Sequence, residues 1–257
     1  MDRIVVDAPV EPIATWIAAA LGADLVGLYL YGSAVSGSYE PDVSDLDLVA
    51  VTRRDAAVLD LARLEGARRK FVADHPEWDN RLELVVIGAE TLRAFRTTAA
   101  DLAVVSPGEP LHLSGPVRDW TQNWFLLRQT ALTLRGRAAR EVLPEVSAAE
   151  FRSAVATYAG WLASQDLEAH SPGALAYAVL SECRALCTLQ TGRPPSKAEG
   201  AEWLARQRPD WASVIDAALA CRRAGGATGF DEPGTKAAAI ELIGSVARSI
   251  RTGPLAV

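Results

Sequence analysis

The sequence predicts an α/β domain with a mixed sheet, followed by an all-α helical-bundle domain. Residues 28–51 read as a strand, a tight Gly-Ser turn, a short helix or loop, and a second strand. The segment RLELVVI at 81–87 alternates as a further strand, and from Trp120 onward the chain is Ala- and Leu-rich with helical spacing. We therefore expect two domains, residues 1–147 and residues 148–257.

The first domain is expected to hold helices and strands in alternation. A helix at 11–21 leads into the first strand, and Asp55 begins a long amphipathic helix that Pro76 ends. After the strand at 81–87 we expect one or two helical turns and then two short strands, at 90–95, 102–105 and 111–113.

The remaining segments predict only helices. The first of them covers Trp120–Arg140 and precedes the domain boundary. Ser147 with Glu150, and later Ser196 with Glu199, have the spacing of capping boxes. The expected helices of the second domain cover 148–165, 174–191, 196–207, 211–224 and 235–250.

Composition restricts the class of protein. A chain of 257 residues with 49% hydrophobic and 23% charged residues is typical of a soluble globular protein. The net charge of −6 argues against nucleic acid as the main partner. The first residues carry acids and prolines instead of an apolar signal segment, and no apolar run reaches the roughly 20 residues of a membrane span. We expect a cytoplasmic monomer with no membrane partner.

Asp45 and Asp47 lie two residues apart in the second strand, so both side chains share one face. Adjacent carboxylates repel each other unless a cation lies between them, and a divalent ion such as Mg²⁺ prefers oxygen ligands. Gly32 and Ser33 follow the first strand, where a close backbone approach and free N–H groups favour phosphate. This combination predicts a nucleotide site. The alternative is a surface turn followed by two solvated acids.

Glu83 lies within the apolar strand at 81–87, where a carboxylate is costly without a metal, a cation or a proton. If this strand pairs beside Asp45 and Asp47, Glu83 can bind metal or act as general base toward a substrate hydroxyl. The alternative is a glutamate on an edge strand that faces solvent.

The second domain contributes cations. Lys197 follows the cap Ser196 in the first helical turn, and Arg193 precedes it. Cations oppose the macrodipole at a helix N-terminus, so their presence there indicates a bound polyphosphate. Arg184 lies in the apolar segment AVLSECRALC and requires a partner for its charge. The alternative is that Arg193 and Lys197 are solvated surface charges.

The Gly-Ser turn, a spacer of about ten residues and Asp-x-Asp resemble the nucleotidyltransferase superfamily signature. The whole chain resembles the AadA-type aminoglycoside adenylyltransferases, which inactivate streptomycin and spectinomycin. The resemblance covers this signature, the Glu83 strand, LTLRGRAAREVLPEVSAAEF and CRALCTLQTGRPPSKAEGAEWL.

The resemblance implies that ATP binds in the interdomain cleft and assembles the site for a cationic aminoglycoside. It implies Glu83 as the catalytic base. The residues implied to contact the ATP phosphates and Mg²⁺ are Ser33, Ser44, Asp45, Asp47, Arg184 and Lys197.

The departures from the family concern the acceptor. The region after Glu83 lacks the family's tryptophan, and the second acid before the Arg184 helix is absent. Trp161 and Asp166 have the spacing of the family's aromatic–acid pair, although Trp161 fits a core position of a helical bundle equally well. Two other functions stay open: a nucleotidyltransferase with another acceptor, such as a protein side chain in a toxin-neutralising system, and a nucleotide-binding module without catalysis. The presence of Asp45, Asp47 and Glu83 together argues against the module without catalysis, because a protein that only binds a nucleotide does not need the base.

Overall fold

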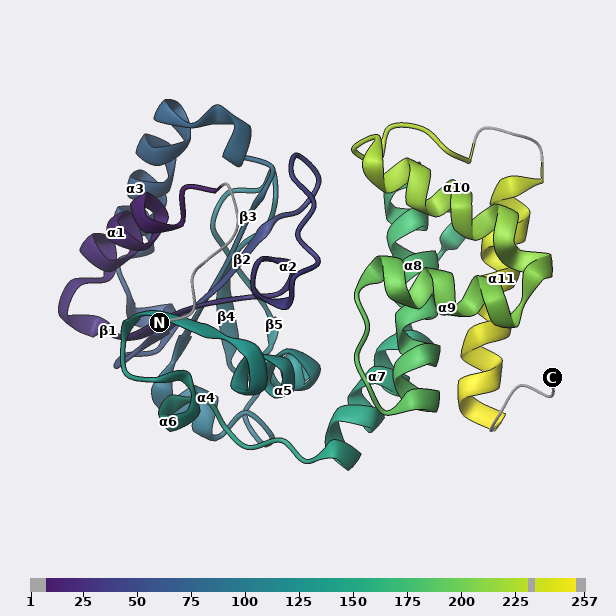
Figure 1. The fold of residues 1–257 in the computed structure, drawn as a ribbon. Coiled ribbons are helices and arrows are strands. Elements are labelled where there is room, and N and C mark those ends of the chain that lie inside the picture. The colour runs from purple at the N-terminus through teal and green to yellow at the C-terminus, as the bar shows by residue number, and fades with distance from the viewer. Residues whose placement is uncertain (1–7, 231–233, 253–257) are drawn as a thin grey trace. The chain divides into compact units, whose positions relative to one another are not determined.

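The protein, a computed structural model, is described over residues 8–230 and 234–252 (Figure 1). It divides into two compact units, Met1–Ser147 and Ala148–Val257. The first contains a six-stranded mixed sheet with helices, and the described residues of the second form helices without strands. The predicted fold class is confirmed. No helix in the described part of the chain is long and apolar enough to cross a membrane.

The sheet has the strand order β5-β4-β3-β2-β1-β6. Its strands are β1 (Leu25–Tyr31), β2 (Leu46–Thr52), β3 (Leu82–Gly88), β4 (Asp101–Val105), β5 (His112–Pro116) and β6 (Leu132–Gly136). The central strands β2 and β3 run parallel, and the other neighbouring pairs are antiparallel. A parallel pair requires a crossover, which here contains a helix of fourteen residues between β2 and β3.

Helices cover both faces of the sheet (Figure 1). The face formed by the leucines of β1, β2 and β3 packs against α1 (Val10–Leu21) and the crossover helix α3 (Leu61–Asp74). The opposite face packs against α4 (Ala89–Arg93), α5 (Thr121–Thr130) and α6 (Ala139–Val142). Because side chains alternate between the faces, the strand sequence alone fixes which residues point toward each helical layer.

The crossover helix begins later than expected. Asp55 precedes a 3-10 turn, Ala56–Val58, and its carboxylate accepts a hydrogen bond from the Thr91 hydroxyl at 2.6 Å. The cap of α3 is Asp60, whose Oδ1 accepts a hydrogen bond from the backbone N–H of Arg63 at 3.0 Å. Both aspartates are suitable caps, and the long-range bond to Thr91 decides between them.

The helix expected over Trp120–Arg140 is wrong in its second half. After α5 the chain becomes extended as β6, which pairs antiparallel with β1 and places Leu30 opposite Leu132. Leu132 and Leu134 alternate toward the leucine-rich core. Pairing with β1 and burial of these leucines outweigh the helical propensity of the segment, because propensity is a weak term beside tertiary packing.

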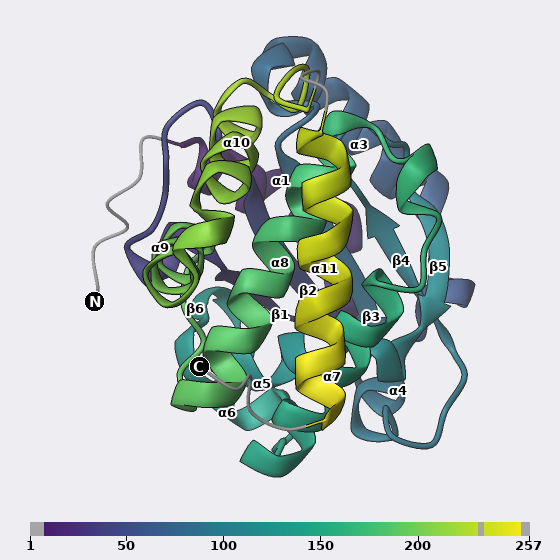
Figure 2. The ribbon, with the colours of Figure 1, turned by 90° about the vertical axis from the view of Figure 1, so that its right-hand side faces the viewer.

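The second unit is built around α8 (Figures 1 and 2). Its helices are α7 (Ala148–Leu162), α8 (Pro172–Thr191), α9 (Lys197–Gln207), α10 (Ala212–Arg223) and α11 (Thr235–Thr252). The central helix α8 contacts each of the others, and Figure 2 shows α11 beside it. The capping box of Ser196 and Glu199 is present at the start of α9, and Cys183 and Cys187 are free and buried.

Glu182 of α8 is an unusual component of this core. Its side chain is fully buried, and neither carboxylate oxygen has a hydrogen-bond partner among the described residues. Burial raises the pKa of Glu182 to about 8, because the ionised form loses its hydration. The carboxyl group is therefore protonated near neutral pH.

We expect Glu182 to make the protein less stable as the pH rises. Below pH 4.5 the carboxyl is protonated in both states; between about 4.5 and 8 only the unfolded chain ionises, so the free energy of unfolding falls across this window. The loss between pH 5.5 and 8 should be about 3 kcal/mol. Urea unfolding measures this: between pH 5.5 and 8, the free energy of unfolding of Glu182→Leu should fall by about 3 kcal/mol less than that of the native chain.

Glu202→Gln provides the matched control, because this glutamate is exposed on α9. Its pH profile should match that of the native chain. If Glu182→Leu shows the same slope as the control, Glu182 is ionised in the folded protein and the interpretation is wrong.

Candidate active site

Asp47 and Glu83 lie side by side on the two parallel strands. The register of β2 and β3 pairs Asp47 with Glu83, and the register of β1 and β2 pairs Tyr31 with Asp47. Paired residues of neighbouring strands point to the same face of the sheet, so the two carboxylates share one face. Their strands are about 4.8 Å apart. Both acids are half-buried, whereas Leu46 and Leu82 next to them are fully buried on the opposite face.

Gly32 lies against the carboxylate of Asp47. A Cβ atom at Gly32 would stand 2.0 Å from Asp47 Oδ2, and the backbone φ of +70° is one that side chains other than glycine rarely adopt. Ser33 follows as the first residue of α2 (Ser33–Ser36). The predicted phosphate turn and the acid pair therefore meet at one place in the first unit.

Asp45 immediately precedes β2 and is half-buried, like Asp47. Ser44 beside it is buried, and its hydroxyl accepts a hydrogen bond from the backbone N–H of Glu40 at 2.9 Å. In this structure the Ser44 hydroxyl fastens the loop before Asp45. Its expected contact with ATP stays a prediction.

Arg81 is the residue of this region that the sequence analysis missed. Its guanidinium donates two hydrogen bonds to the carbonyl oxygen of Ser44, at 2.8 and 3.1 Å, and one to the Tyr39 hydroxyl at 3.0 Å. It also lies 4.5 Å from the ring centre of Trp78. Arg81 immediately precedes β3, so the anchor of the loop before Asp45 lies two residues before Glu83 in the chain. The signal in the sequence was this spacing.

The carboxylates fit a divalent ion that takes part of its ligands from a nucleotide. Mg²⁺ is commonly held by one or two carboxylates together with substrate phosphates and water. Within residues 8–230 and 234–252, no group of three or more His, Cys, Asp or Glu side chains could hold a metal ion by itself. The donor set therefore suits a metal that arrives with phosphate.

The predicted cations lie in the second unit. Lys197 opens α9, and the capping box of Ser196 and Glu199 fixes the backbone there. Arg184 of α8 is half-buried, and its Nε donates a hydrogen bond to the carbonyl oxygen of Pro195 at 3.1 Å. Arg184 thus ties α8 to the segment that leads into α9, and Arg193 is exposed on that segment.

The predicted acceptor residues are on the surface of the second unit. Trp161 is 52% exposed, so the alternative of a core tryptophan is wrong. Asp166 is also exposed, in the connection between α7 and α8. Both side chains are available to a ligand.

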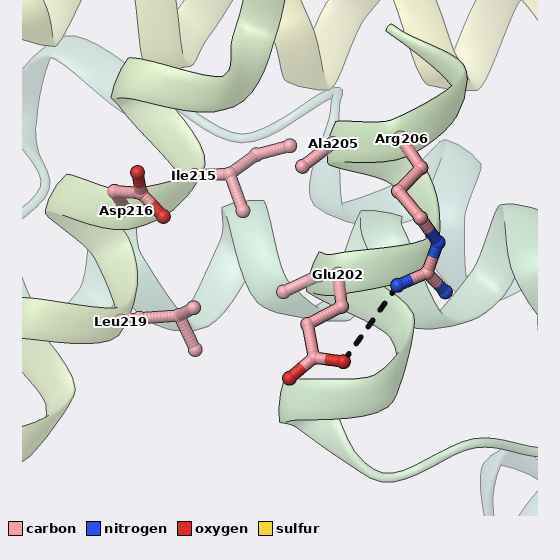
Figure 3. Close-up of a pocket in the computed structure, with 7 residues that line it drawn as sticks. Glu202, Ala205, Arg206, Ile215, Asp216 and Leu219 are labelled. Atoms are coloured by element: carbon pink, nitrogen blue, oxygen red, sulfur yellow. Dashed lines mark ion pairs between the residues drawn. The ribbon is translucent and has the colours of Figure 1, made fainter. Parts of the chain in front are cut away.

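An open pocket of about 220 Å³ lies between α9 and α10 (Figure 3). Ile215, Asp216 and Leu219 of α10 face an exposed ion pair of α9, in which Glu202 and Arg206 are 3.8 Å apart. The residues described as lining it include none of those predicted for catalysis or ligand binding. We therefore assign the candidate site to the acid-bearing strands.

Comparisons with known proteins match both units. Residues 18–89 match the family model of the nucleotidyltransferase domain, and residues 141–244 match that of the aminoglycoside adenylyltransferase C-terminal domain. The fold is similar to the crystal structure of spectinomycin adenyltransferase AAD(9) from Enterococcus faecialis with ATP and spectinomycin. That match has a TM-score of 0.70 at 17% identity and covers 95% of this chain and 98% of the other. No curated protein matches the chain.

The contact between Gly32 and Asp47 predicts a stability effect that can be measured without substrate. Gly32→Ala should lower the free energy of unfolding by about 2–4 kcal/mol, because it combines backbone strain with a clash against the carboxylate. Gly37→Ala is the matched control, since Gly37 has a φ of +79° and no atom within 4 Å of an added Cβ. The control should lose only about 1 kcal/mol.

Denaturant unfolding of both variants checks the difference. Asp47→Ala in the Gly32→Ala background should recover the part of the loss that the clash with the carboxylate causes, while the strain of the Gly32 backbone, with φ 70° and ψ −146°, remains. Equal losses at Gly32 and Gly37 would contradict the contact.

Proposed function

Since the chain is an AadA-type nucleotidyltransferase, we propose that it transfers AMP from Mg-ATP to a hydroxyl of an aminoglycoside or aminocyclitol of the streptomycin and spectinomycin type. Such transfer gives antibiotic resistance, because the modified drug is inactivated. The proposal is supported above all by the pairing of Asp47 with Glu83 on adjacent strands. A binding module has no need of a base beside its metal-binding acids.

The acids divide into two roles in the proposed reaction. Asp45 and Asp47 hold Mg²⁺, and Glu83 takes the proton from the acceptor hydroxyl as general base. The hydroxyl oxygen then bonds to the α-phosphorus of ATP, the bond to the bridging oxygen breaks, and pyrophosphate leaves. When bound, Mg²⁺ neutralises charge on the phosphates.

The nucleotide is held by groups of both units in this proposal. Gly32 and Ser33 offer a close backbone approach to phosphate, which the φ of Gly32 supports. Arg184 and Lys197 contribute positive charge to the phosphates. Each unit by itself matches a family model of nucleotidyl- or adenylyltransferases.

The acceptor is proposed to be cationic. Trp161 is exposed and offers an aromatic face to an ammonium group, Asp166 offers an exposed carboxylate, and Glu83 is a further anionic partner. The solved structure with the similar fold contains ATP and spectinomycin. The alternative function is a nucleotidyltransferase with another acceptor. The absence of the family's second acid, which would contact the drug, is consistent with this alternative.

Pyrophosphate release from Mg-ATP in the presence of an aminoglycoside and aminocyclitol panel tests the assignment. Release that depends on streptomycin or spectinomycin supports it, provided that mass spectrometry finds the drug heavier by one AMP. Release that requires a protein substrate would support the alternative. No release with any acceptor would refute the enzymatic function.

We expect Glu83→Gln to lower turnover by ~10²–10⁴-fold while Mg-ATP affinity is largely kept, because the amide cannot accept the proton. Asp47→Asn is the informative contrast, since a metal ligand should lose both turnover and Mg-dependent ATP binding. Titration calorimetry with Mg-ATP beside turnover separates the two roles. If Glu83→Gln loses ATP affinity as Asp47→Asn does, Glu83 is a metal ligand and the assignment as base is wrong.

Lys197→Ala should weaken Mg-ATP binding by about 1–3 kcal/mol, which is the scale of a lost charge-assisted hydrogen bond. Lys236→Ala is the matched control, because Lys236 is another lysine of the second unit and pairs with Glu168 at 3.5 Å. Calorimetry should find the control unchanged. An unchanged affinity in Lys197→Ala would remove Lys197 from the nucleotide site.

A further inference from the structure

Two of the exposed large hydrophobic residues belong to one set of side chains in the second unit. Trp161 is 52% exposed on α7 and Tyr177 is 45% exposed on α8. Isolated exposed aromatic residues need no explanation, but these two are joined through a third ring, that of Tyr158.

The joined side chains form a continuous series across three helices. The rings of Trp161 and Tyr158 stack with centres 5.5 Å apart and an interplanar angle of 27°. The hydroxyls of Tyr158 and Tyr177 are hydrogen-bonded at 2.9 Å. Lys197 Nζ then lies 5.1 Å from the ring centre of Tyr177, which is cation–π geometry. We call these four residues the aromatic–lysine series.

The backbone of Lys197 is fixed by local contacts. The capping box of Ser196 and Glu199 holds the first turn of α9. Gly200 allows α9 to approach α8, since an added Cβ would stand 3.0 Å from the Cα of Arg184. The lysine side chain has a flexible four-carbon stem. The contact with the ring of Tyr177 gives its ammonium group a defined position.

We propose that Tyr177 and Tyr158 are positioning residues that orient Lys197 for the phosphates of ATP, with Trp161 bracing Tyr158 from the other side. The inference rests on the proposed function, because it concerns the proposed role of Lys197. It gives Trp161 a part in nucleotide binding before any acceptor is present. One set of side chains would then serve both ligands.

Tyr158, whose hydroxyl takes part in this hydrogen bond, is partly buried. Burial raises the pKa of the Tyr158 hydroxyl, and the neighbouring Tyr177 and Glu182 act in the same direction. Tyr158 therefore stays protonated and remains able to donate or accept in the bond to Tyr177.

The test measures Mg-ATP affinity by calorimetry on the full chain without an acceptor. Tyr177→Leu removes the ring face, and we expect a two- to fivefold weaker affinity, about the value of an exposed cation–π contact. Tyr177→Phe and Tyr158→Phe each remove the same hydrogen bond but keep both rings. These two variants should lower the Mg-ATP affinity equally, and by less than Tyr177→Leu. The double variant should bind Mg-ATP no more weakly than either single variant. Trp161→Ala should also weaken binding measurably.

The Lys197→Ala background distinguishes positioning from general structure. If Tyr177 acts through Lys197, Tyr177→Leu should have no further effect once the lysine is removed. A merely structural effect of Tyr177 would weaken binding equally in both backgrounds. Circular dichroism and thermal unfolding establish that every variant is folded, and Lys236→Ala serves again as the control.

Each outcome is decisive. Native-like affinity in Tyr177→Leu, or an equal loss with and without Lys197, overturns the positioning role. Native-like affinity in Trp161→Ala removes Trp161 from the series. A native chain that does not bind Mg-ATP refutes the proposed function itself, which is a different result from the failure of these variants.

Discussion

The parallel pairing of β2 and β3 is the constraint on which the candidate site depends. It places Asp47 opposite Glu83 on one face and Leu46 opposite Leu82 on the other. Side chains alternate with a period of two, so a shift of one residue in this register would bury an acid and expose a leucine. The burial of the leucine face against α1 and α3 thereby fixes the position of the acids on the other face. Core packing and the geometry of the site are set by the same register.

Most of the site's framework could be predicted from the sequence because it depends on local periodicity. Alternation indicated that Asp45, Asp47 and Glu83 face away from the leucines, and all three are half-buried. The Gly-Ser turn predicted a close backbone approach to phosphate, which stays a prediction; in the structure the atom that Gly32 approaches is Asp47 Oδ2. The cap of α9 followed from the Ser-x-x-Glu spacing, which is also a local signal.

The features that could not be predicted depend on contacts distant in the sequence. The strand β6 forms because β1 has an unpaired edge beside it, and the start of α3 depends on a hydrogen bond from Thr91 to Asp55. Arg81 reaches a loop 37 residues earlier. Glu182 lies in a segment whose helical pattern is clear. The burial of its carboxyl, without a hydrogen-bond partner among the residues that the structure describes, follows only from how the helices pack.

The anchoring of the loop before β2 has a consequence for how this region can vary. Ser44 is held at its hydroxyl by Glu40 and at its carbonyl by Arg81, so the chain is fixed immediately before Asp45. Gly37 is exposed and precedes the anchored segment in the chain. Extra residues inserted near Gly37 would extend into solvent, as loop tips commonly allow, while the acids keep their place. The loop can therefore change in length, and contact different ligands, independently of the chemistry at the strands.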